Sequence, residues 1–184
     1  MPRIFVITGP SGVGKTTVAE RLLALRPNLR KVVTCTTRAP RDGEEDGVSY
    51  HFLTADAFTA LRDAGATFED EEVYPGRFYG SRQSDVDALL ANGHDVLFVV
   101  DPKGTRTIKA RHPEVVTIFL DAPTDELLAR LQTRDKGATA DLDARVAAIG
   151  QERAIGETCD HAVQNPQGAL DATVRAVSEI MDRP

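Results

Sequence analysis

Short apolar runs alternate with stretches of helical spacing along most of the chain. β-Prone apolar runs occur at 4–8, 31–36, 96–100 and 115–120, with weaker ones at 49–53 and 161–163. Apolar residues three and four positions apart predict helices over 17–25, 55–64, 84–92, 105–111, 124–133, 142–153 and 169–181. In the helix at 124–133, we expect Thr124 to be the N-cap and Leu127, Leu128 and Leu131 to face the interior.

Buried strands alternating with helices are typical of an α/β fold, a parallel sheet with helices on both faces. The segment at about 34–91 interrupts the alternation, because 37–47 is a polar loop and 66–82 is acidic and aromatic without a clear period. We therefore predict a single domain over 1–184. Its core would be formed by 1–33 and 92–184, and 34–91 would be an insertion with a small sheet of its own.

Composition agrees with an ordinary globular protein. Of 184 residues, 41% are hydrophobic and 27% charged, which excludes a wholly disordered chain. No apolar run approaches the ~20 residues of a membrane helix, and the first residues lack the pattern of a secretory leader. A net charge of −6 argues against a general nucleic-acid binder. The only cysteines, Cys35 and Cys159, cannot form a disulfide framework, so we expect a cytoplasmic protein. The sequence leaves open whether the protein forms a homo-oligomer.

A glycine-rich loop between the first strand and the first helix carries the clearest chemistry. It matches G-x-x-x-x-G-K-[ST] with the residues Gly9, Pro10, Ser11, Gly12, Val13, Gly14, Lys15 and Thr16. In such a loop backbone amides and the helix N-terminus bind phosphate oxygens, the lysine reaches the β- and γ-phosphates, and the hydroxyl binds Mg²⁺. We expect ATP to bind here, with Thr17 also in contact.

Asp101 follows the apolar run 96–100 directly. The carboxyl edge of a parallel sheet is where ligands bind, so Asp101 is a candidate for Mg²⁺. The alternative is an ordinary helix cap. No other metal site is evident, because the four histidines are scattered.

Two arginines, Arg38 and Arg41, flank a stiffening proline in the polar loop. Arginine forks suit bidentate phosphate binding. The alternative is a solvated loop in which the arginines pair with the neighbouring acidic residues Glu44, Glu45 and Asp46.

The run Thr36-Thr37-Arg38-x-Pro40-Arg41-x-Gly43-Glu44-x-x-Gly47-x-x-Tyr50-x-Phe52 closely resembles the signature of the guanylate kinase family. Further similar stretches follow in the family's order, from residue 4 to about 175. They are Glu69–Val73, Phe78-Tyr79-Gly80-Ser81, Val100-Asp101-Pro102-Lys103-Gly104, Ile118-Phe119-Leu120, Arg130-Leu131-x-x-Arg134, Arg145 and Asn165.

The resemblance implies a P-loop fold with a monophosphate-binding insertion and a lid at about 130–147. It also implies Mg²⁺-dependent transfer of the γ-phosphoryl group of ATP to GMP, giving ADP and GDP. By position, the GMP phosphate would be held by Arg38, Arg41, Tyr50 and Tyr79, and guanine or its surroundings would be recognised by Thr34, Glu69 and Ser81. Asp101 would also belong to the substrate-binding residues. Arg130, Arg134, Arg145 and Asn165 would lie around ATP. The catalytic set would be Lys15, Arg38, Arg134, Arg145 and Asp101.

The chain also departs from the family pattern. There is one residue more than usual, with Pro75 in it, between Val73 and Tyr79, so Glu71 and Glu72 compete with Glu69 as the guanine-reading carboxylate. Phe78 replaces a tyrosine, Thr34 a serine, and Pro102-Lys103 a Trp-Gln pair. These changes fit a relative acting on a modified guanine nucleotide. Two further functions stay open: a kinase of another small phosphorylated acceptor and, more remotely, a non-catalytic binding module.

Overall fold

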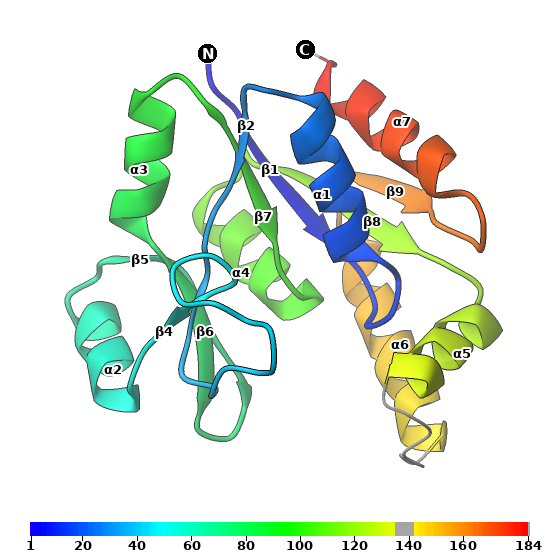
Figure 1. Ribbon diagram of the computed structural model, residues 1–184, viewed down its shortest axis with the longest axis horizontal. Helices are drawn as coiled ribbons and strands as arrows, with labels where there is room; N and C mark the ends of the chain where they lie inside the picture. Colours follow the sequence, from blue (N-terminus) through cyan, green and yellow to red (C-terminus); the bar gives the residue numbers. More distant parts are fainter. Residues whose placement is uncertain (135–141, 184) are drawn as a thin grey trace.

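The computed structural model describes residues 1–134 and 142–183. Its centre is a five-stranded sheet in the order β2-β7-β1-β8-β9, in which every pairing is parallel (Figure 1). The strands are β1 (Ile4–Thr8), β2 (Leu29–Lys31), β7 (Asp95–Val99), β8 (Val116–Asp121) and β9 (His161–Gln164). The predicted parallel α/β architecture is therefore confirmed.

Helices cover both faces of this sheet (Figure 1). Helices α1 (Lys15–Leu25) and α7 (Leu170–Met181) lie along one face, and α3 (Gln83–Ala91) and α4 (Pro102–Arg111) lie along the other. Helices α5 (Thr124–Arg134) and α6 (Leu142–Gly156) follow β8. Because the strands are parallel, their carboxyl ends share one edge of the sheet, and the glycine-rich loop lies at that edge.

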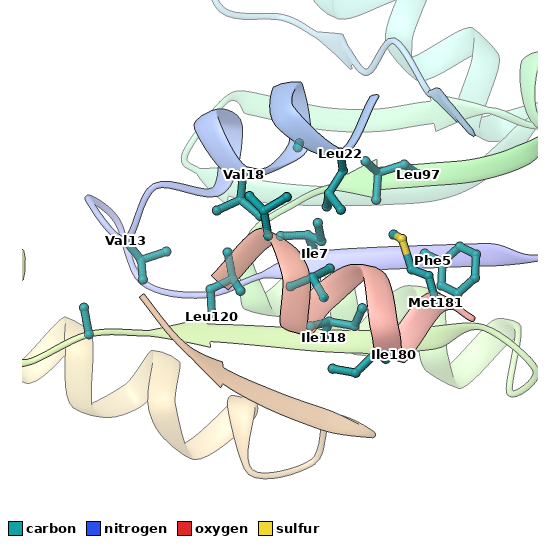
Figure 2. Packing of buried hydrophobic residues seen from close by; sticks show 14 of the residues in the cluster. Phe5, Ile7, Val13, Val18, Leu22, Leu97, Ile118, Leu120, Ile180 and Met181 are labelled. Atoms are coloured by element: carbon teal, nitrogen blue, oxygen red, sulfur yellow. The ribbon is translucent and has the colours of Figure 1, made fainter. Parts of the chain in front are cut away.

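Alternate residues of β1 face two hydrophobic clusters. Phe5 and Ile7 pack with Leu22 of α1 and Val177 of α7, whereas Val6 joins Ile108 of α4 in the second cluster. Figure 2 shows the first cluster, with α7 lying across the strands that carry Ile7 and Ile118. A strand buried on both faces explains the continuous apolar run in the sequence. This rigid strand positions the loop that follows it.

A second sheet is built from the insertion, in the order β4-β3-β6-β5. Its strands are β3 (Cys35–Thr36), β4 (His51–Phe52), β5 (Thr67–Tyr74) and β6 (Arg77–Arg82), and α2 (Ala55–Asp63) packs beside them. The sheet is mixed, because β3 pairs with β4 in parallel and with β6 antiparallel, and β5 and β6 form an antiparallel hairpin. Phe58 of α2 stacks on Phe78 of β6 with 5.6 Å between ring centroids.

The small sheet is attached to the core through β5 and α4. Phe68 stacks on Phe98 of β7 and on His112, which follows α4. The carboxylate of Asp70 accepts from Arg111 at 3.1 Å, and Glu71 accepts from the hydroxyl of Thr107 at 3.2 Å. The acidic strand β5 therefore commits two of its carboxylates to this junction.

Two predicted boundaries were wrong for a physical reason. The run 31–36 is not one strand, because β2 ends at Lys31 in the large sheet and β3 begins at Cys35 in the small one. Helix α4 begins at Pro102 rather than at Thr105, since a proline is favourable in the first turn and Asp101 caps it.

The expected role of Thr124 as an N-cap was also wrong. Helix α5 begins at Thr124 itself, and the first helical hydrogen bond runs from the Leu127 amide to the Pro123 carbonyl. The Thr124 hydroxyl instead accepts a hydrogen bond from Arg153 of α6 at 2.8 Å. The expected inward face is confirmed: Leu127 and Leu131 are buried, and Leu128 packs beside them.

None of the helices in the described ranges, 1–134 and 142–183, is long and apolar enough to cross a membrane.

Candidate active site

The glycine-rich loop turns sharply between Thr8, the last residue of β1, and Lys15, the first of α1. Gly9 and Gly14 have φ angles of 142° and 96°, a region that L side chains rarely adopt. A Cβ at Gly9 would lie 2.1 Å from the Leu120 carbonyl oxygen, so a side chain there would clash with the backbone of β8. The loop can thus lead into the N-terminus of α1, where free backbone amides favour phosphate.

Lys15 lies against the loop it follows. Its Nζ donates to the carbonyl oxygens of Gly9 at 2.6 Å and Pro10 at 3.2 Å. The charge of Lys15 also acts on Glu152 of α6, whose carboxylate accepts a hydrogen bond from the Ser11 amide. Burial raises the pKa of Glu152, and Lys15 and the Ser11 amide oppose that rise. An internal carboxylate therefore lies at the phosphate loop.

Asp101 lies between the end of the neighbouring strand β7 and the start of α4. Its Oδ1 accepts from the Gly104 amide at 2.9 Å, which makes it the N-cap of α4. Its Oδ2 accepts no hydrogen bond from the part of the chain that the structure describes. Thr16 is exposed in the first turn of α1. The cap interpretation of Asp101 is thus confirmed, and one oxygen is still available to a ligand.

Arg130 and Asn165 support the loop from the other side. Arg130 donates to Glu126 at 2.9 Å, to the Asn165 carbonyl at 3.1 Å and to the Val13 carbonyl at 3.4 Å. The buried amide of Asn165 donates to Val13 at 2.7 Å and accepts from the Thr173 hydroxyl. Asn165 therefore fixes the backbone of the phosphate loop through Val13.

A cavity of about 510 Å³ lies next to Arg130, lined by Ala129, Arg130, Thr133 and Gln167. It is large enough for a nucleobase. The predicted lid lies partly outside the described residues, as does the side chain of Arg134. Arg145 is half-buried in the first turn of α6.

The guanidinium of Arg38 is almost fully engaged in the small sheet. Its side chain is 8% exposed, and its two terminal nitrogens donate to Glu44 at 2.7 and 2.9 Å. Its Nε donates to the Tyr79 hydroxyl at 3.3 Å. Glu44 also accepts from the Arg41 amide at 2.8 Å. These bonds raise the pKa of Arg38 and lower that of Glu44 to about 2.

Aromatic rings surround the same arginine. Its guanidinium lies 5.1 Å from the centroid of the Tyr50 ring and 5.9 Å from that of Phe52. Tyr50 and Tyr79 meet edge to face at 6.2 Å. Arg41, at the other end of this loop, is exposed. The structure therefore brings together Arg38, Tyr50 and Tyr79, with Arg41 beside them, as the sequence indicated.

Glu69 faces inward from β5, directly opposite Ser81 of β6. It is 2% exposed, and its Oε1 accepts from the Ser81 hydroxyl at 2.9 Å. The competing carboxylates are committed elsewhere, Glu71 to Thr107 and Glu72 to the Gly76 amide. Thr34 is half-buried beside β3, and its carbonyl accepts from the His51 amide at 2.9 Å. The β5–β6 hairpin keeps one register from Glu69 to Glu72, and the pairing shifts by one residue on either side of this stretch, between Thr67 and Glu69 and between Glu72 and Tyr74.

Burial raises the pKa of Glu69 to about 7, and the hydrogen bond from Ser81 opposes part of that rise. A buried carboxylate facing two donors of a ligand would gain charge-assisted hydrogen bonds. Cys35, on the neighbouring strand, is buried with a pKa raised by burial to about 11, so it is not a thiolate nucleophile at neutral pH.

Comparison with known proteins identifies the family to which a chain with this phosphate loop and small sheet belongs. The family description "Guanylate kinase" matches residues 1–184. The guanylate kinase of Salinibacter ruber is 42% identical over 182 residues, 97% of this chain and 96% of its own length. The chain belongs to the guanylate kinase family. The guanylate kinase of Bordetella pertussis is 39% identical over 171 residues, covering 92% of this chain and 79% of its own length.

Solved structures agree with the family assignment. A guanylate kinase from Anaplasma phagocytophilum superposes with a TM-score of 0.77 at 29% identity, over 98% of this chain and 84% of its own. A shikimate kinase from Bacteroides thetaiotaomicron matches with a TM-score of 0.53 at 12% identity, which shows a shared fold only.

The donor set at the guanylate kinase phosphate loop fits Mg²⁺. Thr16 offers a hydroxyl and Asp101 a carboxylate oxygen, both hard ligands, and neither uses these oxygens within the described residues. Within those residues, no group of three or more His, Cys, Asp or Glu side chains could hold a metal ion alone. Mg²⁺ commonly uses one or two protein ligands with substrate phosphates and waters, so a sparse set is sufficient.

Sequence reasoning named Glu44 only in the alternative interpretation, as a carboxylate that pairs with the arginines of a solvated loop. The structure confirms this pairing for Arg38, and Glu44 also accepts from the Arg41 amide. Glu152 was not predicted, because only the packing of α6 brings it to Ser11. The G-E dipeptide inside the arginine motif was a signal for Glu44, whereas nothing local in the sequence identifies Glu152.

Proposed function

We propose that the protein transfers the γ-phosphoryl group of ATP to GMP, giving ADP and GDP. One observation carries the proposal. The face of the small sheet that holds the buried pair Glu69 and Ser81 also holds Arg38 and Tyr79, so a base-reading group and a phosphate-binding group lie in line. Membership of the guanylate kinase family supports it.

The acceptor would bind across this face. The Glu69 carboxylate would accept from N1–H and N2–H of guanine, while adenine offers no such pair of donors. Ser81, Thr34 and Asp101 would complete the surroundings of the base. Arg38, Arg41, Tyr50 and Tyr79 would hold the 5′-phosphate, with Arg38 already fixed by Glu44 before substrate arrives. Pre-fixed side chains save the entropy of ordering them on binding.

The donor would bind at the glycine-rich loop. Backbone amides of residues 9–16 and the N-terminus of α1 would hold the phosphates of ATP, and Thr17 would add to this contact. Lys15 would turn from Gly9 and Pro10 to the β- and γ-phosphates. The base of ATP would lie in the cavity beside Arg130, close to the loop that Asn165 fixes.

Transfer needs the two phosphates in line and their charge neutralised. Lys15, Arg38 and the lid arginines Arg134 and Arg145 would supply positive charge around the transferred group. Mg²⁺, held by Thr16 and Asp101, would neutralise charge on the phosphate oxygens. Closure of the lid and of the small sheet β4-β3-β6-β5, which we call the acceptor sheet, would exclude water. Water otherwise competes for the phosphoryl group. Both cysteines are free, which supports a reducing compartment, and we propose the cytoplasm.

The test is transfer of labelled γ-phosphate from ATP, with the nucleotide products separated. We expect labelled GDP when GMP and Mg²⁺ are present, and no labelled GDP with excess chelator or without GMP. Labelling of inorganic phosphate alone would identify an ATPase. Labelling of a ribose phosphate or a modified guanine nucleotide in place of GMP would favour a kinase of that acceptor, and no ATP turnover with any acceptor would favour a binding module.

A further inference from the structure

Besides Arg38 and Arg41, a third arginine lies at the proposed phosphate end of the small sheet. It is Arg77, the first residue of β6. Successive residues of a strand point to opposite faces, so Arg77, Tyr79 and Ser81 share one face and follow one another at about 6.8 Å. Ser81 pairs with Glu69, and Tyr79 accepts from Arg38. Arg77 therefore comes next in the row that begins with the base-reading pair and continues with the phosphate-binding pair.

The pairing of β3 with β6 brings the loop after β3 close to the start of β6. Thr36 pairs with Tyr79, and the Thr37 amide donates to the Phe78 carbonyl at 3.1 Å. Strand β3 ends at Thr36, so Arg38 lies in the loop just after this pairing, and both Arg38 and Arg77 line one cavity. Like charges around one cavity repel each other, and an anion between them would reduce that repulsion.

The turn before Arg77 is well fixed. It contains Pro75 and Gly76, whose φ is 72°. The Gly76 amide donates to Glu72 at 2.7 Å, and its carbonyl accepts from the Thr37 hydroxyl at 3.3 Å. These hydrogen bonds hold the turn and the start of β6 against the loop after β3.

A cavity of about 500 Å³ lies between this turn and the loop from Arg38 to Arg41. Arg38, Arg41 and Arg77 all line it. Within residues 1–134 and 142–183, Glu44 pairs with Arg38, whereas neither Arg41 nor Arg77 forms an ion pair. Two exposed guanidinium groups therefore flank the cavity with their donors available, beside a third whose fork is already taken.

We propose that Arg77 is an additional binding residue for the 5′-phosphate of the acceptor nucleotide, acting with Arg41 and with Arg38, most of whose donors are already used within the protein. The inference rests on the proposed function, because it assumes that the acceptor phosphate binds at this end of the small sheet. A phosphate monoester is a compact dianion at neutral pH, and arginine forks bind it bidentately. Arg77 thereby favours phosphorylated acceptors over their nucleosides.

The experiment compares GMP with guanosine, which has the same base and sugar but no phosphate. Dissociation constants of both are measured by calorimetry, without ATP, for wild type, Arg77→Asn, Arg77→Lys and Arg175→Asn. Arg175 is an exposed arginine of α7, on the opposite side of the molecule, and controls for loss of one charge (Figure 1). We expect Arg77→Asn to weaken GMP about tenfold and guanosine less than twofold, Arg77→Lys to be intermediate, and Arg175→Asn to change neither.

Thermal unfolding separates binding from structure. Because Arg77 is exposed, has no ion-pair partner among the described residues and lines a cavity with two other arginines, Arg77→Asn should keep or slightly raise the melting temperature of the free protein. Equal weakening of GMP and guanosine, or no change in either, would overturn the inference about Arg77. A wild-type protein that binds GMP no more tightly than guanosine would remove the acceptor-phosphate site itself, and with it the proposed function as well.

Discussion

Under the proposed function the phosphate loop and the small sheet would bind the same kind of ligand, yet the two regions are built in different ways. At the loop, the binding groups are backbone amides of one continuous segment, and Lys15 bonds to the carbonyl oxygens of Gly9 and Pro10. At the acceptor sheet, they are side chains from several strands, already fixed by one another, as the pair Arg38 and Glu44 shows. The loop is specified by local spacing, whereas the acceptor sheet is specified by tertiary packing.

Internal carboxylates accompany the cations in both places, with different consequences. An arginine as buried as Arg38 would be costly without a counter-charge, and Glu44 provides it through two short hydrogen bonds. Glu152 is held at the loop by the Ser11 amide and by the charge of Lys15, while burial raises its pKa. Arg38 is thus already fixed by Glu44, whereas Lys15 would have to exchange its present partners to bind phosphate as proposed.

The largest effect expected is that of Lys15→Met. Loss of the ammonium group should lower kcat by about 10²–10³-fold or more, because its charge acts on the transferred phosphate. The melting temperature of the free protein should stay within a few degrees, since Lys15 is not a core residue. Lys31→Met, on the edge strand β2, is the control and should keep near wild-type turnover. A Lys15→Met enzyme of near wild-type rate would refute the role of the loop.

Glu69→Gln tests the base-reading end of the acceptor sheet. The amide keeps the size of the side chain but offers only one acceptor toward the two donors of guanine. We expect kcat/KM for GMP to fall about 10²-fold and the margin of GMP over AMP to narrow. Glu72→Gln is the matched control, because Glu72 bonds the Gly76 amide in the turn rather than facing Ser81. If the margin collapsed in Glu72→Gln and held in Glu69→Gln, the register assigned to the site would be wrong.

Arg41→Ala and Arg38→Ala separate binding from preorganisation. Arg41 is exposed, so its loss should lower kcat/KM for GMP about tenfold without changing stability. Loss of Arg38 should lower it by up to about 10²-fold and also lower the melting temperature, since Glu44 loses its partner. The KM for ATP should stay nearly constant in both variants. A rise in the KM for ATP with an unchanged KM for GMP would mean that the two subsites were exchanged.

The smallest effect concerns pH. Glu69 has a pKa of about 7 in the folded protein, above its ordinary value of 4.5, so the folded state binds the extra proton. Its contribution to stability is complete below pH 4.5 and is lost as the pH rises through about 7. Stability of Glu69→Gln should therefore depend less on pH over this window.

The affinity for guanosine should depend on pH in the opposite direction to stability. Guanine needs the ionised carboxylate, so affinity for guanosine should rise severalfold between about pH 6 and 8, with proton release seen by calorimetry in two buffers. Guanosine is used because it carries no phosphate that titrates in this range. Affinity independent of pH in wild type, or equally dependent on pH in Glu69→Gln, would contradict the assigned role of Glu69.

The same contrast explains what the sequence could predict. The phosphate loop could be predicted because its glycines and Lys15 lie within eight consecutive residues between a buried strand and a helix. Asp101 could be predicted because it follows the apolar strand β7 closely. The hairpin of β5 and β6 was missed, because its inward position 69 carries a buried glutamate rather than an apolar side chain. The split of 31–36 between two sheets was missed because hydrophobic pattern does not say which sheet a β-prone residue joins.

The most direct test of the account is the ratio of kcat/KM for GMP to that for AMP in the wild-type protein, with ATP and Mg²⁺ saturating. A buried carboxylate built to accept from guanine leaves itself unpaired against adenine, and such sites discriminate by about 10⁴–10⁵-fold. We predict a ratio in that range. Comparable use of the two nucleotides, or ATP consumption that ignores GMP, would contradict the claim that the acceptor sheet reads guanine.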